Sequence, residues 1–124
     1  MQYCLNMEGF IMPFINIKTN AEVSDVCGET IKASLGKAIT ALPGKSESWL
    51  MVGIEPKYRL WFKGDSSPAA MVTVNIYGTP SPSAMNDLTG RITSILTDNL
   101  PISPDRIYVS YMCTDNWGWN GNNF

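Results

Sequence analysis

The chain has 124 residues, a formal net charge of −2 and a pI near 4.9. This length fits one domain with its own hydrophobic core. The acidic balance and the lack of a Lys/Arg run argue against a nucleic-acid partner, and no apolar run is long enough to cross a bilayer. Residues 1–11 lack the charged and long apolar regions of a secretory signal, so we expect a soluble protein made in the cytosol.

The cysteines and the missing histidine restrict the chemistry. Cys4, Cys27 and Cys113 are odd in number, far apart in the sequence and include no C-x-x-C pair. This pattern predicts reduced, partly buried thiols rather than a disulfide scaffold or a thiol redox site. Histidine is absent, which removes Ser-His and Cys-His dyads and a common zinc ligand. We expect no metal and no cofactor, so any proton transfer needs a different base.

The first half of the chain predicts a strand, a helix and a second strand. Residues 13–19 ("PFINIKT") alternate apolar and polar side chains, which is typical of a strand. Ser24 offers a helix N-cap, and Pro43-Gly44 ends that helix. Residues 48–55 then predict a mostly buried strand, and residues 58–62 a further short strand. The apolar positions of the helix, near helical spacing, are Cys27, Ile31, Leu35, Ile39 and Leu42.

The second half repeats this order. Residues 71–78 alternate like a strand, and Ser81-Pro82 supplies an N-cap followed by proline at the first helical position. Pro101 ends this second helix, and residues 106–112 predict another strand. A tail rich in Gly and Asn follows. The apolar stripe of the second helix is Met85, Leu88, Ile92, Ile95 and Leu96.

The duplicated pattern predicts an α/β (α+β) fold. Strands joined through a helix tend to be parallel, because the crossover is right-handed. Two such βαβ units can form one four-stranded mixed sheet with both helices on one face. The opposite sheet face would then be bare and partly apolar, which predicts self-association.

Several short stretches, in this order, resemble one known family. They are "MPFINI" from Met12, "GK" at 44–45 followed by Trp49, Phe62 followed by "GDSSP", "ISPDRIYVSY" at 102–111, and "GWNG" before the final Phe124. The chain resembles the macrophage migration inhibitory factor (MIF) family of the tautomerase superfamily, which includes D-dopachrome tautomerase. The resemblance implies a homotrimer of subunits with two βαβ units each. It covers residues 13–124 as a MIF-like tautomerase domain and leaves residues 1–12 as an N-terminal extension.

The resemblance gives Pro13 a special meaning. Proline has no amide N–H for a sheet, so Pro13 can simply mark where the first strand begins. In the family the proline is the N-terminal residue, and its secondary amine is the general base that moves a proton between the keto and enol forms of a substrate. That role requires removal of Met12, whereas a retained extension would turn the nitrogen into an amide. Three alternatives stay open: translation starts at Met12, the extension is cleaved, or the extension is kept. We expect a start at Met12.

Further site residues also follow from the resemblance. Lys45 would face the carboxylate of an enolisable keto acid, although a lysine just after a helix can also be merely solvated. Trp49, Trp119 and Phe124 would form the rim and mouth of the pocket, although tail aromatics also pack for ordinary reasons. The family tyrosine that enters the pocket from the neighbouring subunit corresponds to Tyr108. Two positions depart from better-known members: Tyr77 replaces an isoleucine and Ser110 replaces an asparagine.

Three functions stay open at this point. The first is a cofactor-free tautomerase of the phenylpyruvate or D-dopachrome type, with Pro13 as its base. The second is a cytokine-like protein that binds a cell-surface receptor through a vestigial or blocked site, since family members leave cells without a signal peptide. The third is a trimer whose pocket is plugged by Gly9, Phe10 and Ile11.

Overall fold

The computed structural model describes residues 12–124, so the expectations for the extension, the apolar plug and Cys4 lie outside the described residues. The main elements in chain order are β1 (Phe14–Thr19), α2 (Asp25–Ala38), β2 (Met51–Glu55), β3 (Ala70–Tyr77), α3 (Pro82–Asn99) and β4 (Ile107–Thr114). Short 3-10 turns are η1 (Ile39–Ala41), η2 (Glu47–Trp49) and η3 (Pro104–Arg106), and the tail forms β5 (Gly118–Trp119) and β6 (Asn122–Asn123).

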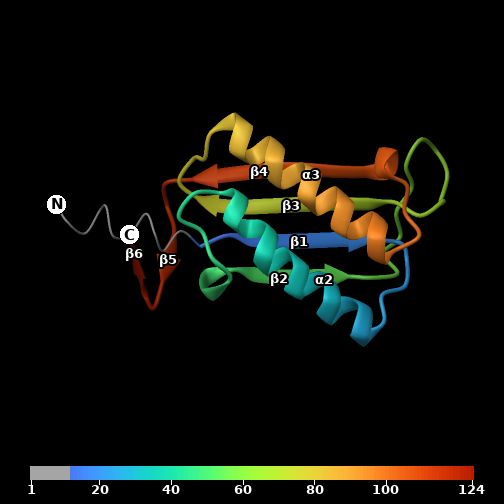
Figure 1. The fold of residues 1–124 in the computed structure, drawn as a ribbon, viewed down its shortest axis with the longest axis horizontal. Coiled ribbons are helices and arrows are strands. Elements are labelled where there is room, and N and C mark those ends of the chain that lie inside the picture. The colour runs from blue at the N-terminus through green and yellow to red at the C-terminus, as the bar shows by residue number, and fades with distance from the viewer. Residues whose placement is uncertain (1–11) are drawn as a thin grey trace.

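The main sheet has the strand order β2-β1-β3-β4, and both long helices cover one of its faces (Figure 1). Strands β1 and β2 are parallel, as are β3 and β4, because a helix connects each pair. The two units meet through the antiparallel pair β1 and β3, in which Ile15 lies opposite Val74. This arrangement confirms the predicted mixed four-stranded sheet with two helices on one face.

Local sequence signals explain where the helices begin. The Ser24 hydroxyl accepts a hydrogen bond from the amide of Cys27 at 3.1 Å, and the Ser81 hydroxyl accepts one from the amide of Ala84 at 3.2 Å. Each bond satisfies an amide that has no partner inside the helix. Pro82 occupies the first turn of α3, where its missing N–H costs nothing.

The core lies between the sheet and the two helices. In β1 and β3 every second residue is buried, which places one face of each strand against the helices. The predicted helical stripes face this layer, and their central residues are fully buried. The fully buried core side chains are Ile15, Ile17, Ile31, Leu35, Ile39, Leu42, Val72, Val74, Ile76, Leu88, Ile92 and Leu96.

The predicted strand at 58–62 is wrong. Only Phe62 forms a bridge, and its partner is Asp65 within the same loop. The chain turns at Lys57, whose φ of 56° lies in the left-handed region. The amide of Tyr58 then donates to the carbonyl of Thr19 at 2.9 Å, so the segment closes the end of β1 instead of extending the sheet.

The predicted strand at 48–55 is shorter than expected, since Glu47–Trp49 forms the 3-10 turn η2 and the strand begins at Met51. The two cysteines in the described part of the chain are free, as predicted, but only Cys27 is partly buried whereas Cys113 is exposed. Neither helix within residues 12–124 combines the length and hydropathy needed to span a bilayer.

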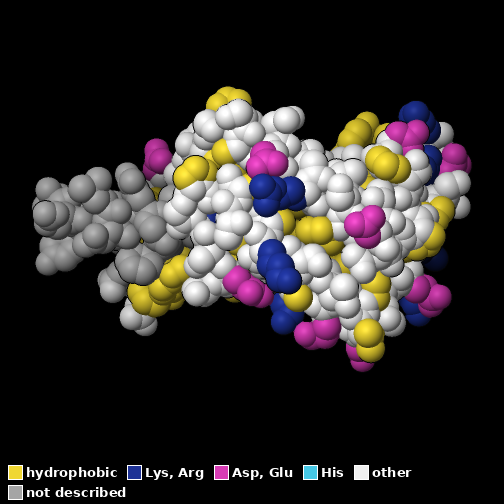
Figure 2. All heavy atoms as spheres, viewed as in Figure 1, with side chains coloured by type: hydrophobic (Ala, Val, Ile, Leu, Met, Phe, Trp, Pro, Cys, Tyr) yellow, Lys and Arg dark blue, Asp and Glu magenta, His cyan; other side chains and the backbone are white. Residues whose placement is uncertain are grey.

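The face of the sheet away from the helices is mixed in polarity. Asn16, Thr73 and Ser110 lie in register across its middle. Met51 (66% exposed) and Met112 (58% exposed) both lie in the neighbouring row toward Pro13, and Met71 lies in the row on the other side. The face is therefore partly apolar, as expected. On the helical face, basic and acidic side chains are interspersed (Figure 2).

Candidate functional site

One end of the sheet brings Pro13 together with the chain segments that were predicted to surround it. In Figure 1 the start of β1, the end of β3, the connection from α2 to β2 and the β5–β6 hairpin all lie at this end. Pro13 is buried, and its carbonyl accepts a hydrogen bond from the amide of Met51 at 3.0 Å. This bond extends the pairing of β1 with β2 by one residue and holds Pro13 at the start of β1.

Lys45 belongs to the connection between η1 and η2 at the same end. Gly44, with a φ of 79°, turns the chain there, and the amide of Lys45 donates to the carbonyl of Leu42 at 3.1 Å. Lys45 is only 6% exposed. The alternative of a merely solvated lysine after a helix is therefore wrong, because a buried ammonium is desolvated and acts more strongly on nearby charge.

Two pairs of aromatic rings lie at this end of the sheet. The rings of Trp49 and Trp119 meet edge to face, with centroids 5.1 Å apart and planes at 87°. The rings of Tyr77 and Phe124 are tilted at 49°, with centroids 5.2 Å apart. Each pair joins a residue of the main fold to the tail, so the tail aromatics pack specifically on this end.

A small hairpin presents these tail aromatics. Strands β5 and β6 pair antiparallel around Asn120 and Gly121, whose φ angles are 54° and 86°. The amide of Phe124 donates to the carbonyl of Trp117 at 3.0 Å and closes the hairpin. Asn-Gly is a strong signal for a two-residue hairpin turn, so the sequence contained the information for this element although we did not predict it.

Tyr108 and Ser110 do not lie at the Pro13 end. Tyr108 is in register with Met71, which is in register with Lys18 near the far end of β1. Lys18 is five positions along the chain from Pro13, and in an extended strand this separation corresponds to about 16 Å. Tyr108 is 60% exposed, and Ser110 lies between the two ends on the open face. Within one chain, the two residues are therefore remote from Pro13.

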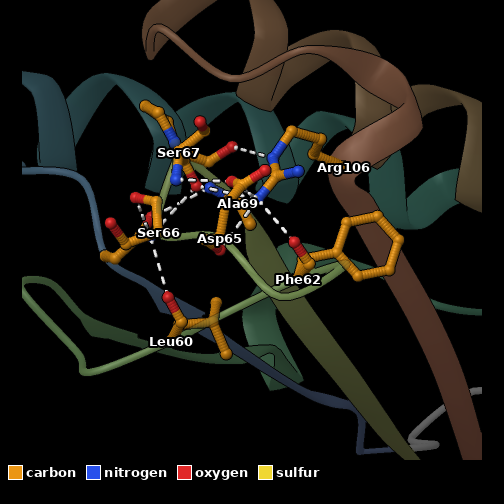
Figure 3. A network of polar contacts seen from close by, with 9 residues as sticks. Leu60, Phe62, Asp65, Ser66, Ser67, Ala69 and Arg106 are labelled. Carbon is orange, nitrogen blue, oxygen red and sulfur yellow. Dashed lines mark hydrogen bonds and ion pairs between the residues drawn. The ribbon is translucent and has the colours of Figure 1, made fainter.

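The far end is built around the loop between β2 and β3, and the sequence analysis did not identify the contacts that hold this loop. Arg106, with a side chain 14% exposed, pairs with the carboxylate of Asp65 at 3.0 Å. Its guanidinium also donates to carbonyl oxygens of the loop between β2 and β3 (Figure 3). These acceptors, with their distances, are Pro68 at 3.0 Å, Ser67 at 3.1 Å, Phe62 at 3.2 Å and Asp65 at 3.4 Å.

Asn20 holds the same loop from the end of β1. Its side-chain amide donates to the carbonyls of Leu60, Ser66 and Ser67 at 3.1 to 3.2 Å, and its oxygen accepts from the amide of Ala69 at 2.9 Å. These contacts span about 40 to 50 residues of sequence, so no local pattern could reveal them.

The electrostatics of the loop favour an ionised Asp65. Hydrogen bonds from the backbone and side chain of Ser67 lower the pKa of this carboxyl below its usual value, and the nearby Arg106 charge acts in the same direction. A cavity of about 150 Å³ lies beside the loop, lined mainly by apolar atoms. Its lining includes Leu60, Trp61, Phe62 and Tyr108. Within residues 12–124, no group of three or more His, Cys, Asp or Glu side chains could hold a metal ion.

Comparisons with known proteins agree with this architecture. Residues 12–124 match the family model described as Macrophage migration inhibitory factor (MIF). The chain is 31% identical to the macrophage migration inhibitory factor of Meriones unguiculatus over 115 residues, which cover 91% of this chain and 99% of that protein. The corresponding rat protein is 30% identical with the same coverage.

Solved structures give the same result. The crystal structure of Leishmania major MIF2 superposes with a TM-score of 0.86 at 34% identity, covering 91% of this chain and 97% of that one. The Trichinella spiralis macrophage migration inhibitory factor gives a TM-score of 0.75 at 26% identity, with coverage of 90% and 99%. The family match over residues 12–124, together with the sheet order and the paired helices, shows that this chain belongs to the macrophage migration inhibitory factor family.

Proposed function

We propose that the form of this protein whose N-terminus is Pro13 is a cofactor-free keto-enol tautomerase of the phenylpyruvate or D-dopachrome type. The observation that supports it best is the burial of Pro13 at the end of the sheet that also carries the buried Lys45 and the two aromatic ring pairs. A base, a cation and apolar walls are what proton transfer next to the carbonyl of an aromatic keto acid needs.

The base is the Pro13 nitrogen. A free α-amino group titrates near pH ~8, and burial or a neighbouring ammonium lowers its pKa. The neutral amine takes a proton from the carbon next to the substrate carbonyl, and the carbonyl π electrons move onto oxygen. The protonated amine then returns a proton to that oxygen, giving the enol, and the reverse sequence gives the ketone. Inside a longer chain the same nitrogen is a tertiary amide, which cannot act as a base.

The other residues bind and orient the substrate. The Lys45 ammonium pairs with the substrate carboxylate and offsets the negative charge that develops on the enolate oxygen. Trp49, Tyr77, Trp119 and Phe124 form the apolar wall for an aromatic side chain. The Tyr77 hydroxyl makes no hydrogen bond to any residue in the described part of the chain, so it is available to a polar group on the substrate.

Assembly completes the proposed site. Tyr108 is exposed and about 16 Å from the row of its own Pro13, so it can reach a Pro13 pocket only in a neighbouring subunit. We therefore place Tyr108 and Ser110 in the partner's pocket of a homotrimer, where they add a wall and hydroxyl groups. The exposed methionines of the open sheet face also favour burial against another subunit.

Three proteins test this proposal. The first is produced from Met12 and verified by mass spectrometry to begin at Pro13, the second is the full 124-residue chain, and the third is Pro13→Gly in the short form. All elements of the described fold lie within residues 12–124, so the short form keeps the whole sheet and core. We expect ketonisation of phenylpyruvate by the first protein only, with kcat/KM lower by about 100-fold or more in Pro13→Gly. Equal activity in all three would remove Pro13 from the mechanism.

A further inference from the structure

Outside the Pro13 end, the loop between β2 and β3 packs against Tyr108. Tyr108 is 60% exposed, but its ring contacts another aromatic ring. It meets the ring of Phe62 edge to face, with centroids 4.9 Å apart and planes at 76°. Phe62 is therefore the neighbour that sets the direction of an otherwise exposed side chain.

Phe62 is itself fixed by Arg106. The guanidinium of Arg106 lies over the Phe62 ring, 5.2 Å from its centroid, and also donates to the Phe62 carbonyl at 3.2 Å. Arg106 ends the turn η3 and Tyr108 lies two residues later in β4, and both side chains contact the ring of Phe62. The Phe62 ring packs against both of them.

The loop that carries Phe62 is held at further points. Asp65 pairs with the same guanidinium, and the carbonyls of Ser67 and Pro68 accept hydrogen bonds from it (Figure 3). A planar fork with several fixed acceptors leaves little rotational freedom, unlike the single charge of a lysine. Such a network is more than an isolated surface ion pair, because most of its bonds are to backbone and the guanidinium is largely buried.

We propose that Phe62 and Arg106 are positioning residues that orient Tyr108 for the pocket of the neighbouring subunit. The inference rests on the proposed function, which places Tyr108 in that pocket. Arg106 fixes the loop, the loop fixes the Phe62 ring, and the ring fixes the direction of Tyr108 before a second subunit arrives. Binding and catalysis depend steeply on such placement, and a displacement of about 1 Å can lower a rate by up to 100-fold.

A double-mutant cycle tests the inference in the form that begins at Pro13. Phe62→Leu removes the ring and keeps an apolar side chain, whereas Phe62→Tyr keeps the ring. We expect Phe62→Leu to lower kcat/KM for phenylpyruvate by about 5- to 10-fold, mainly through KM, and Phe62→Tyr to stay within about 2-fold. In a Tyr108→Ala background the same Phe62→Leu change should alter kcat/KM by less than about 2-fold, because a residue that acts through Tyr108 has nothing left to position.

Arg106→Lys gives a second, independent arm of the cycle. Lysine keeps the positive charge but lacks the planar guanidinium that bonds several acceptors. We therefore expect Arg106→Lys to lower kcat/KM, and to have no such effect in the Tyr108→Ala background. Ser66→Ala is the matched control, since it lies in the same loop and only its backbone carbonyl contacts Asn20. The control should leave kcat/KM unchanged.

A measurement without substrate separates this inference from the proposed function. In protein with ¹³C-labelled tyrosine rings, assigned with Tyr108→Phe, Phe62→Leu and Arg106→Lys should lower the order parameter of the Tyr108 ring, and Ser66→Ala should not. An unchanged order parameter in both variants overturns the inference whether or not the protein is active, and so do losses of kcat/KM that persist in full in the Tyr108→Ala background. A lower order parameter without tautomerase activity supports the positioning role and refutes the proposed reaction.

Discussion

Replacing Asn20 by alanine tests whether one side chain holds the loop between β2 and β3. The Asn20 amide nitrogen has two hydrogens and lies within 3.2 Å of the carbonyls of Leu60, Ser66 and Ser67, so it makes two full hydrogen bonds at a time. The oxygen accepts a third bond from the amide of Ala69 at 2.9 Å. Asn20→Ala removes all three.

The expected loss of stability follows from the surroundings of these groups. A neutral hydrogen bond contributes about 1 kcal/mol net, so three bonds give about 3 kcal/mol. Water can replace the asparagine at the exposed Ser66 and Ser67 carbonyls, which reduces the loss. Ala69, however, is 2% exposed, and its unpaired amide costs about 1 to 3 kcal/mol. We expect the free energy of unfolding to fall by about 2 to 4 kcal/mol.

Urea denaturation at a fixed protein concentration measures this loss, and limited trypsin digestion reports on the loop itself. Lys63 lies in the loop and is exposed, so cleavage after it should become faster in Asn20→Ala. Asn86→Ala, an exposed site on α3, is the control and should change the free energy of unfolding by less than about 0.5 kcal/mol. If Asn20→Ala matches this control in both assays, the loop is not held by Asn20 and the reasoning fails.

Two pH-dependent variants complete the set. Burial raises the pKa of the Tyr111 phenol, and the hydrogen bond with Thr89 partly offsets this effect. The stability that the neutral phenol contributes is therefore present below about pH 10 and is lost as the pH rises through the folded-state pKa. Tyr111→Phe should cost about 1 kcal/mol at pH 7 from the lost bonds, and its urea midpoint should fall less steeply than that of the wild type between pH 9 and 11; parallel curves would contradict this assignment. Hydrogen bonds from Ser67 lower the pKa of Asp65, so its contribution is present above the usual carboxyl pKa and is lost as the pH falls through the folded-state value. Asp65→Asn should therefore be less stable than the wild type at pH 7 and approach it near pH 2 in thermal melts, whereas a constant difference would exclude an ionised Asp65 as the cause.

Sequence reasoning succeeded where local physics decides the structure. Period-two alternation in residues 13–19 and 71–78, and helical spacing after Ser24 and Ser81, each fix one face of an element without reference to the rest of the chain. The handedness of βαβ crossovers then leaves few arrangements, so the mixed sheet with helices on one face followed. The family resemblance added Pro13 and its predicted neighbours, whose catalytic and binding roles stay predictions.

Sequence reasoning failed at the strand predicted for residues 58–62. A mostly apolar and aromatic run of that length fits a strand as well as it fits a loop. Contacts with residues far away in the sequence decide which of the two forms. Here Asn20 and Arg106 take up the carbonyls of the loop from about 40 residues away, which leaves Phe62 without a strand partner outside its own turn.

The sequence by itself determined the two helices, the four strands of the main sheet, their order, and the buried side of β1, β3 and both helices, because these depend on chirality, spacing and caps over a few residues. Only the tertiary structure decided that Lys45 is buried, that tail rings pair with Trp49 and Tyr77, and that Tyr108 lies far from its own Pro13. These features depend on how strands are registered and how loops close over long separations, and such contacts leave no periodic trace in the chain.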